Sequence, residues 1–286
     1  MKKLLFQLDT DPIPSAFDIV TAYDAGAHHV VSYAGIAPDQ VQGLVHGCIF
    51  TRGGEDLRHT AIWIGGRDIA AGEQVLDVVT KSFFGDFRVS VMLDSNGANT
   101  TAATAVAQLI RAVDVREGTV VVAAGTGPVG IRTAGLFARE GARVIVTSPL
   151  RDQLERASEL VKARFGAEIV TRYVENGDVD GYRTLLADAR VLFGAGPAGV
   201  RLVPETAWQE SAGLEAVVDL NLAPPSGIEG VSTGDAGKER AGKRCFGAIG
   251  VGHPKMKLHK ACIASLFERK DLVLDIAEIY AAARGL

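Results

Sequence analysis

Six residues near the middle of the chain, Gly125-Thr126-Gly127-Pro128-Val129-Gly130, have the glycine spacing of a loop that holds a diphosphate. The apolar run Val120-Val121-Val122-Ala123-Ala124 leads into this loop, and a helical pattern follows it. In that setting Gly125 permits a tight turn, Gly127 lets a ligand approach the backbone, and Gly130 lets the helix lie close to the strand. The free N–H groups at the start of such a helix attract phosphate. We therefore predict a dinucleotide site here, the alternative being a plain strand-to-helix turn.

The end of the next predicted strand bears on the identity of the nucleotide. A site selective for NAD usually carries Asp or Glu there, which binds the ribose 2′-hydroxyl. This chain reads Val146-Thr147-Ser148-Pro149-Leu150-Arg151, and its first carboxylate is Asp152. The hydroxyls of Thr147 and Ser148 and the guanidinium of Arg151 are groups that bind a 2′-phosphate. NADP is therefore the favoured cofactor and NAD is also possible, while the alternative for Arg151 is a solvated residue at a helix start.

A second glycine cluster, Gly194-Ala195-Gly196-Pro197-Ala198-Gly199, follows the apolar run Val191–Phe193. Parallel strands place their carboxyl ends at one edge of the sheet, so this cluster should share an edge with the first. The segment Asp219-Leu220-Asn221-Leu222 ends a further strand at that edge. We predict that both segments line the nicotinamide side of the site, through Gly194, Ala195, Gly196 and Asn221. The alternative is that they are tight loops without a ligand.

One polar segment breaks the regular pattern of the first hundred residues, Asp94-Ser95-Asn96-Gly97-Ala98-Asn99-Thr100-Thr101. It lies where a predicted strand ends and the alanine-rich helical stretch Ala102–Ala112 begins. Open α/β sheets bind ligands at such positions, because side chains and free helix N–H groups both point into the crevice. A helix-capping loop without a ligand explains the segment equally well.

The elements that must position these residues alternate between strands and helices, which implies parallel sheets covered by helices. In the first hundred residues, Ser15 is predicted to cap the first helix. The strand-like runs are Leu4–Leu8, Val30–Tyr33, Gly47–Thr51, Thr60–Ile64 and Val89–Leu93, and the helical patterns are Phe17–Gly26, Pro38–Val45 and Gly72–Phe83.

A second alternating series begins at Gly118, and a polar elbow at Gly252–Lys257 follows it. The strands are predicted at Thr119–Ala124, Gly141–Thr147, Ala167–Tyr173, Ala189–Phe193 and Leu214–Leu220, and the helices at Val129–Glu140, Arg151–Phe165, Gly181–Ala187, His259–Phe267 and Leu272–Ala283. We therefore expect an α/β protein of two domains with a cleft between them. One is an N-terminal parallel α/β domain, residues 1–103 with 263–286, and the other a Rossmann-type doubly wound domain, residues 104–262.

The composition of the chain excludes several classes of protein. Its 286 residues are 47% hydrophobic and 22% charged, unlike a disordered chain. The net charge of −4 gives no general attraction to nucleic acid or to an anionic membrane, and no apolar run reaches the roughly 18–20 residues of a membrane span. Cys48, Cys245 and Cys262 are widely spaced, so we expect neither disulfides nor a metal site. A cytoplasmic location is expected.

Several motifs together resemble the bacterial methylene-tetrahydromethanopterin dehydrogenases, and they occur in order along nearly the full chain. They are Phe6-Gln7-Leu8-Asp9-Thr10-Asp11, Phe50-Thr51-Arg52-Gly53-Gly54, Met92-Leu93-Asp94-Ser95-Asn96-Gly97, Ala124-Gly125-Thr126-Gly127-Pro128-Val129-Gly130 and Lys255-Met256-Lys257-Leu258-His259-Lys260-Ala261-Cys262-Ile263. The chain looks most like the NADP-dependent form of methylotrophic one-carbon metabolism, although Ser148-Pro149-Leu150-Arg151 replaces that form's Gly-Arg-Lys pattern. The resemblance implies hydride transfer from the methylene carbon of a reduced pterin to NAD(P), and a homo-oligomer.

The resemblance also implies roles for particular residues. It implies a functional lysine, carried first onto Lys255. Phe17 is a candidate to stack on the pterin, and core packing is its alternative. His253 and His259 are expected to be structural, since hydride transfer needs no imidazole. Further candidates to bind the pterin are Asp18, Asp94, Asn96, Asn99, Thr101 and Lys257.

Related folate enzymes add a cyclohydrolase activity through a Tyr-x-x-x-Lys arrangement. Here the residue four positions after Tyr33 is Ala37, so no cyclohydrolase activity is expected. Two other functions stay open. One is the same reaction on methylene-tetrahydrofolate, and the other is an NADP-binding sensor without turnover.

Overall fold

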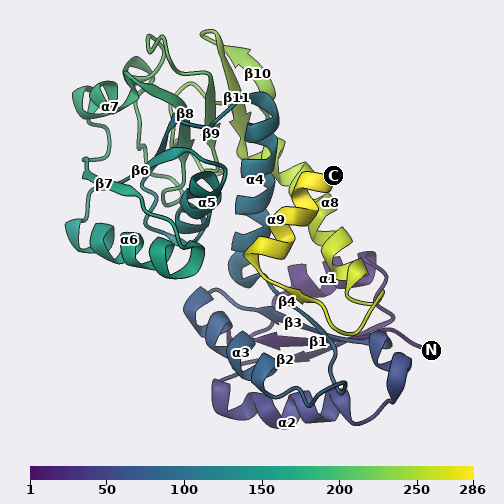
Figure 1. Cartoon of the computed structure of the whole chain (residues 1–286). Coiled ribbons are helices and arrows are strands. Elements are labelled where there is room, and N and C mark those ends of the chain that lie inside the picture. The colour runs from purple at the N-terminus through teal and green to yellow at the C-terminus, as the bar shows by residue number, and fades with distance from the viewer. The chain divides into compact units, whose positions relative to one another are not determined.

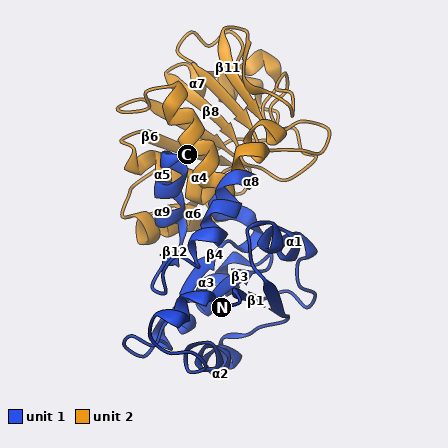
Figure 2. Ribbon diagram, turned by 90° about the vertical axis from the view of Figure 1, so that its right-hand side faces the viewer, with its two compact units in different colours: residues 1–100, 256–286 blue, residues 101–255 orange.

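The computed structural model describes all 286 residues, and they form two compact units (Figure 2). Unit 1 comprises Met1–Thr100 with Met256–Leu286, and unit 2 comprises Thr101–Lys255. These limits lie near the expected domain limits at residues 103 and 263. Each unit has its own sheet and its own buried core, and none of the helices is long and apolar enough to cross a membrane.

The sheet of unit 1 has five parallel strands in the order β12-β4-β3-β1-β2 (Figure 1). Because β1 pairs with both β2 and β3, the strand order reverses between β1 and β3. Open α/β sheets bind ligands beyond the carboxyl ends of the strands at such a reversal. The strands are β1 (Leu4–Asp9), β2 (His29–Tyr33), β3 (Thr60–Gly65), β4 (Ser90–Leu93) and β12 (Val273–Leu274).

Alternating residues of these strands are buried on opposite faces of the sheet. Ile62 and Ile64 of β3 belong to the core formed with helices α2 and α3, which lie together on one side of the sheet in Figure 1. Trp63 points to the other face, where its ring contacts His259 of helix α8. The helices with residues in unit 1 are α1 (Ala16–Asp24), α2 (Pro38–Ile49), α3 (Ile69–Lys81), the start of α4 (Ala98–Ala112), the second half of α8 (Ala248–Ser265) and α9 (Ile276–Gly285).

The sheet of unit 2 has seven strands in the order β10-β11-β9-β8-β5-β6-β7, and only β10 is antiparallel to its neighbour. The six parallel strands have the order of a Rossmann fold, with the reversal between β5 and β8. They are β5 (Thr119–Ala123), β6 (Arg143–Ser148), β7 (Val170–Tyr173), β8 (Ala189–Gly194), β9 (Ala216–Asp219) and β11 (Lys243–Gly247), and β10 covers Ala236–Arg240. The helices are α5 (Pro128–Arg139), α6 (Arg151–Phe165) and α7 (Val179–Leu186), with most of α4 and the first part of α8.

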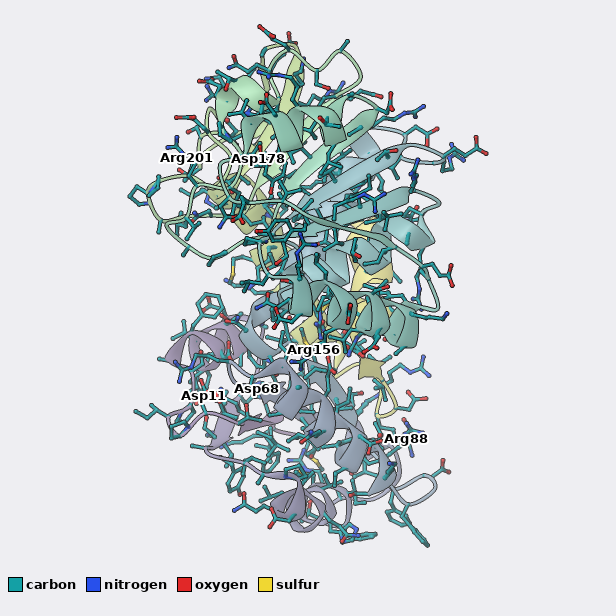
Figure 3. All side chains as sticks on the ribbon, turned by 90° about the vertical axis from the view of Figure 1, so that its left-hand side faces the viewer. Asp11, Asp68, Arg88, Arg156, Asp178 and Arg201 are labelled. Carbon is teal, nitrogen blue, oxygen red and sulfur yellow. The ribbon has the colours of Figure 1, made fainter.

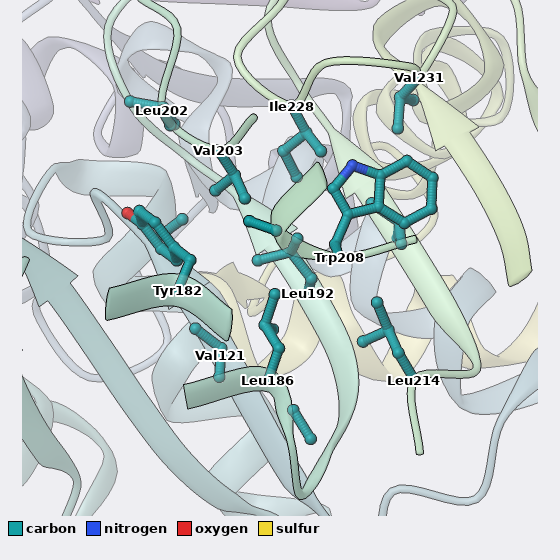
Figure 4. Packing of buried hydrophobic residues seen from close by; sticks show 14 of the residues in the cluster. Val121, Tyr182, Leu186, Leu192, Leu202, Val203, Trp208, Leu214, Ile228 and Val231 are labelled. Atoms are coloured by element: carbon teal, nitrogen blue, oxygen red, sulfur yellow. The ribbon is translucent and has the colours of Figure 1, made fainter. Parts of the chain in front are cut away.

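The core of unit 2 packs one face of this sheet against α7 and the loops that follow β8 (Figure 4). Trp208 is fully buried there, and its Nε1 donates a hydrogen bond to the carbonyl oxygen of Glu229 at 2.9 Å. Tyr182 is also buried, with its hydroxyl 3.1 Å from that of Thr147. Both aromatic rings therefore keep a polar partner while their apolar area leaves water.

Side chains that accept backbone N–H groups begin three of the helices. The hydroxyl of Ser15 accepts the N–H of Asp18 at 3.3 Å, which confirms the predicted cap of α1. Asp68 caps α3 and Asp178 caps α7 in the same way, at 3.1 and 3.0 Å. Both aspartates are labelled in Figure 3.

Three expectations about local structure are wrong. The helix expected at Leu272–Ala283 begins only at Ile276, because Val273–Leu274 form strand β12 and pair with β4. The run Gly47–Thr51 is not a strand, because α2 continues to Ile49. Val41, Val45, Cys48 and Ile49 are all buried, which is helical spacing across a stretch that Gly43 and Gly47 make a poor helix former.

The polar elbow expected at Gly252–Lys257 is also wrong, since these residues lie inside helix α8. Pro254 cannot donate to the carbonyl of Gly250, as a helix would otherwise require. The Nε2 of Gln108 instead reaches that carbonyl at 3.5 Å, a long contact.

The hairpin of β10 and β11 was not predicted from the sequence. Its turn residues Ala241 and Gly242 both have positive φ, 47° and 72°, and Ala-Gly is not the usual Asn-Gly signal.

Candidate functional site

The glycine loop of unit 2 connects β5 to α5 at the reversal of strand order. Gly127 is the residue before the helix and Pro128 is its first residue, so the helix begins at the loop with its N–H groups directed outward. A Cβ on Gly130 would lie 2.4 Å from the carbonyl oxygen of Gly125, and one on Gly125 would lie 2.6 Å from Cγ1 of Val122. The turn itself therefore requires glycine at positions 125 and 130.

Gly127 differs from its two neighbours in this motif. No atom lies within 4 Å of the position that its Cβ would occupy, and its φ of −80° is open to any residue. The protein alone does not require glycine there. The space in front of a helix N-terminus suits the diphosphate of a dinucleotide, so the loop fits such a cofactor.

The end of β6 presents a single cationic side chain. Arg151 is exposed, and its guanidinium stacks over the ring of Tyr173 at 4.1 Å from the ring centre. The hydroxyl of Thr147 is fully buried, accepts the N–H of Ala124 at 3.2 Å and lies beside Tyr182. The hydroxyl of Ser148 is also buried and accepts the N–H of Leu150 at 3.0 Å. Of the three side chains predicted to bind the 2′-phosphate, only that of Arg151 therefore faces solvent.

The second glycine cluster lies against the first. The N–H of Ala195 donates to the carbonyl of Ala123 at 3.0 Å, and a Cβ on Gly196 would lie 2.9 Å from that of Ala124. This cluster therefore packs on the end of β5, at the edge where it was expected.

Asn221 holds the loop after β9 in shape. Its Oδ1 accepts the N–H groups of Gly199 and Ala223, and its Nδ2 donates to the carbonyl of Pro225 at 3.1 Å. Asp219 accepts the N–H groups of Asn221 and Ile228. Burial nevertheless raises the pKa of Asp219, and its backbone hydrogen bonds oppose this shift.

The strand reversal in unit 1 places two carboxylates beside the end of β3. A Cβ on Gly65 would lie 3.0 Å from Oδ2 of Asp18 and 3.4 Å from Oδ2 of Asp9. Asp9 is buried and accepts the N–H groups of Asp11 and Ser15, so it stabilises the loop before α1. Phe17 at the start of α1 is 53% exposed as a residue, which argues against the alternative of a core phenylalanine.

Some side chains of the polar segment after β4 are buried and stabilise it, and one is exposed. Asp94 is buried and accepts the N–H and the hydroxyl of Thr100, at 3.0 and 2.6 Å. Asn99 is buried and donates to Leu93 and Asp275. Asn96 is exposed and adopts a φ of 55°, in the left-handed region that Asn tolerates better than most residues. Thr101 is half-buried in α4. The capping alternative thus describes Asp94, Asn99 ties the start of α4 to Leu93 and Asp275, and Asn96 is the exposed member.

The two candidate lysines lie in helix α8, not in a loop. Residues two apart on an α-helix point about 200° away from one another, so Lys255 and Lys257 cannot face the same ligand. Lys255 is half-buried and Lys257 is exposed. Lys255 and His259 are four residues apart and share a face of the helix.

Three buried residues of unit 1 were not predicted as parts of a site. Trp63, Thr100 and His259 cluster with Asp94.

No three His, Cys, Asp or Glu side chains come together in a way that would hold a metal ion. Burial raises the pKa of the Cys48 and Cys262 thiols to about 12, so both are protonated at neutral pH.

The Rossmann strand order and its glycine loop define the class of protein as dinucleotide-binding. A family model described as "Methylene-tetrahydromethanopterin dehydrogenase, N-terminal" matches residues 16–96. "Bifunctional protein MdtA" of Methylorubrum extorquens is 48% identical over 100% of this chain and 99% of its own. The "NAD(P)-dependent methylenetetrahydromethanopterin dehydrogenase" of the same organism is 30% identical over 94% and 93%. The chain belongs to the methylene-tetrahydromethanopterin dehydrogenase family.

Solved structures confirm the fold. A 5-ketofructose reductase of Gluconobacter sp. strain CHM43 superposes with a TM-score of 0.53, at 13% identity, over 100% of this chain and 99% of its own. At that identity the likeness extends to the fold alone.

Proposed function

We propose that the protein transfers a hydride from methylene-tetrahydromethanopterin to NAD(P), and that NADP is its main cofactor. The observation that carries this proposal is the loop at Gly127, where the protein leaves space in front of a helix N-terminus. The name of the 30% identical relative supports the substrate and the cofactor, and the description of the matching family model supports the substrate. We further propose that unit 2 binds the nucleotide and that unit 1 binds the pterin at the reversal between β1 and β3.

The reaction does not require a general base from the protein. The methenyl product is a cation delocalised over two nitrogens, so the hydride leaves without a general base. A bound nicotinamide supplies the acceptor. The tasks of the chain are to bind, orient and exclude water. We assign the orientation of the reacting ring to Lys255, stacking on the pterin to Phe17, and contacts with its polar edges to Asp18 and Asn96.

The direct test follows reduced nicotinamide spectrophotometrically with methylene-tetrahydromethanopterin and methylene-tetrahydrofolate, each with NADP and with NAD. We expect the highest kcat/KM with methylene-tetrahydromethanopterin and NADP. A higher kcat/KM with methylene-tetrahydrofolate would favour the folate alternative. Absence of turnover with both pterins would favour a sensor.

Arg151 is expected to determine the preference for NADP. Replacing it with alanine removes a guanidinium that can pair with the 2′-phosphate, so the KM for NADP should rise about tenfold. The KM for NAD, which lacks that phosphate, should change less than twofold. Arg156→Ala, an exposed arginine of the same helix, is the matched control. Equal effects of Arg151→Ala on NADP and NAD would contradict this role.

Hydrolysis of the methenyl product is expected to be no faster with the protein than without it. The position four residues after Tyr33 is Ala37, which precedes α2 and carries no amine. The name of the 48% identical relative contains the word bifunctional, so hydrolysis should be measured directly. The assay follows the loss of methenyl-tetrahydromethanopterin without nucleotide, over a range of protein concentrations. A rate proportional to protein concentration would overturn this prediction.

We also propose that the protein is a cytoplasmic homo-oligomer. All three cysteines are free and buried, as suits a reducing compartment. Sedimentation or light scattering would give the number of subunits.

A further inference from the structure

His259 is a buried histidine whose ring nitrogens form no hydrogen bond. Its side chain is 1% exposed, and both Nδ1 and Nε2 lack a hydrogen-bond partner. Nδ1 does lie 3.2 Å from Oδ2 of Asp94, the distance of an ion pair, but at an angle outside hydrogen-bond geometry. Beside it, Nε1 of Trp63 is also buried without a partner.

Burying this imidazole costs free energy, and the carboxylate of Asp94 is the polar group close enough to offset part of that cost. Burial removes its two nitrogens from water, and no protein group replaces those hydrogen bonds. Natural proteins typically leave a buried polar group without hydrogen bonds where function requires it. The ring therefore calls for an explanation other than packing.

His259 contacts a buried carboxylate, that of Asp94, and a half-exposed ring, that of Phe17. Thr100 donates its hydroxyl and its N–H to Asp94, which holds that carboxylate at the start of α4. Asp94 in turn lies against Nδ1 of His259. The imidazole also meets Phe17 edge to face, with ring centres 6.3 Å apart and planes at 84°. Phe17 is the half-exposed ring at the strand reversal.

We infer that His259 is a positioning residue: held by Asp94, it sets the orientation of the Phe17 ring on which the substrate's pterin stacks. This inference rests on the proposed function for its substrate, but the positioning itself does not. Edge-to-face geometry fixes the plane of the partner ring, because the positive edge of one ring meets the negative face of the other. An oriented Phe17 would bind the pterin without losing side-chain freedom at that moment.

The first experiment tests positioning without any substrate. 4-Fluorophenylalanine is placed at position 17, and its ¹⁹F resonance is recorded in the wild-type protein and in His259→Leu. We expect the resonance to shift or broaden in His259→Leu and to stay unchanged in Ile263→Val. Ile263 is buried on the same face of α8 and serves as the control for a small packing change. An unchanged resonance in His259→Leu would overturn the inference, whatever the substrate is.

The second experiment is a double-mutant cycle with Phe17→Leu. His259→Leu should raise the KM for the methylene pterin about tenfold, the size of one lost aromatic contact, with kcat and the KM for NADP nearly unchanged. The same substitution in the Phe17→Leu background should add less than twofold. The melting temperature of His259→Leu should fall below that of the wild type, because the buried Asp94 carboxylate loses the nearby imidazole.

A lower melting temperature with an unchanged KM would show that His259 is only structural, and additive effects on KM would show that it acts independently of Phe17. Failure of the wild-type protein to turn over either pterin would defeat the proposed function, while the ¹⁹F result would still decide whether His259 positions Phe17.

Discussion

Replacing Gly127 with alanine is expected to raise the KM for NADP about fiftyfold while the melting temperature of the free protein stays unchanged. The added methyl group meets no protein atom within 4 Å, and the φ of −80° is normal for alanine. The methyl group would instead occupy the space that the diphosphate needs. Overpacking of this kind is worth about 1–3 kcal/mol, and each 1.4 kcal/mol is tenfold in binding. Steady-state kinetics with varied NADP and a thermal melt without ligand provide the two measurements.

Gly130→Ala is the contrasting variant. Its Cβ would lie 2.4 Å from the backbone oxygen of Gly125, so the fold itself must shift. We expect this variant to lower the free energy of unfolding by about 3 kcal/mol, and its melting temperature to fall before any ligand is added. If Gly127→Ala also melted early, the open space at Gly127 would not be a binding site kept clear for the nucleotide.

Replacing Lys255 with methionine is expected to lower kcat about 100-fold with the KM for NADP unchanged. Methionine keeps the length and apolar stem of lysine but cannot donate a hydrogen bond. A misplacement of about 1 Å at the reacting carbon is enough for a loss of roughly this size. Measurement of kcat with both substrates saturating separates this loss from weaker binding.

Lys257→Met provides the comparison within the same helix. Because Lys257 points about 200° away from Lys255, its replacement should leave kcat within about threefold of the wild type. Similar losses in the two variants would mean that α8 is not helical through this stretch in the working enzyme. A loss only in Lys257→Met would exchange the roles of the two lysines.

The elements with strong local patterns were predictable from sequence. The helix Arg151–Phe165 has the bounds that its periodicity indicates, and strands β1 to β9 lie within a few residues of predicted runs, whereas β10, β11 and β12 were not predicted. Strands that are buried on both faces read as continuous apolar runs, and helices with one buried face read with a period near 3.6. Where these patterns weaken, as at Gly43 and Gly47 or around Pro254, the prediction was wrong.

The same distinction holds for the candidate sites: one that is built from contiguous residues could be predicted, and one that is built from distant segments could not. Local sequence was enough to find the glycine loop, because its strand, its turn and its helix are contiguous. The cluster of Trp63, Asp94, Thr100 and His259 combines three distant segments, so no spacing along the chain announces it. Sequence also did not show that the hydroxyl of Thr147 is buried against Tyr182, 35 residues away.

The sequence by itself thus determined two alternating α/β series, the glycine loop between β5 and α5 and the absence of a carboxylate at the end of β6. The tertiary structure decided which candidate side chains are exposed, that Lys255 and Lys257 point apart, and that His259 contacts both Asp94 and Phe17. The physical reason is that backbone propensity and hydrophobic period act over a few neighbouring residues. Burial and side-chain contact instead depend on which strands become neighbours, and only the folded sheet establishes that order.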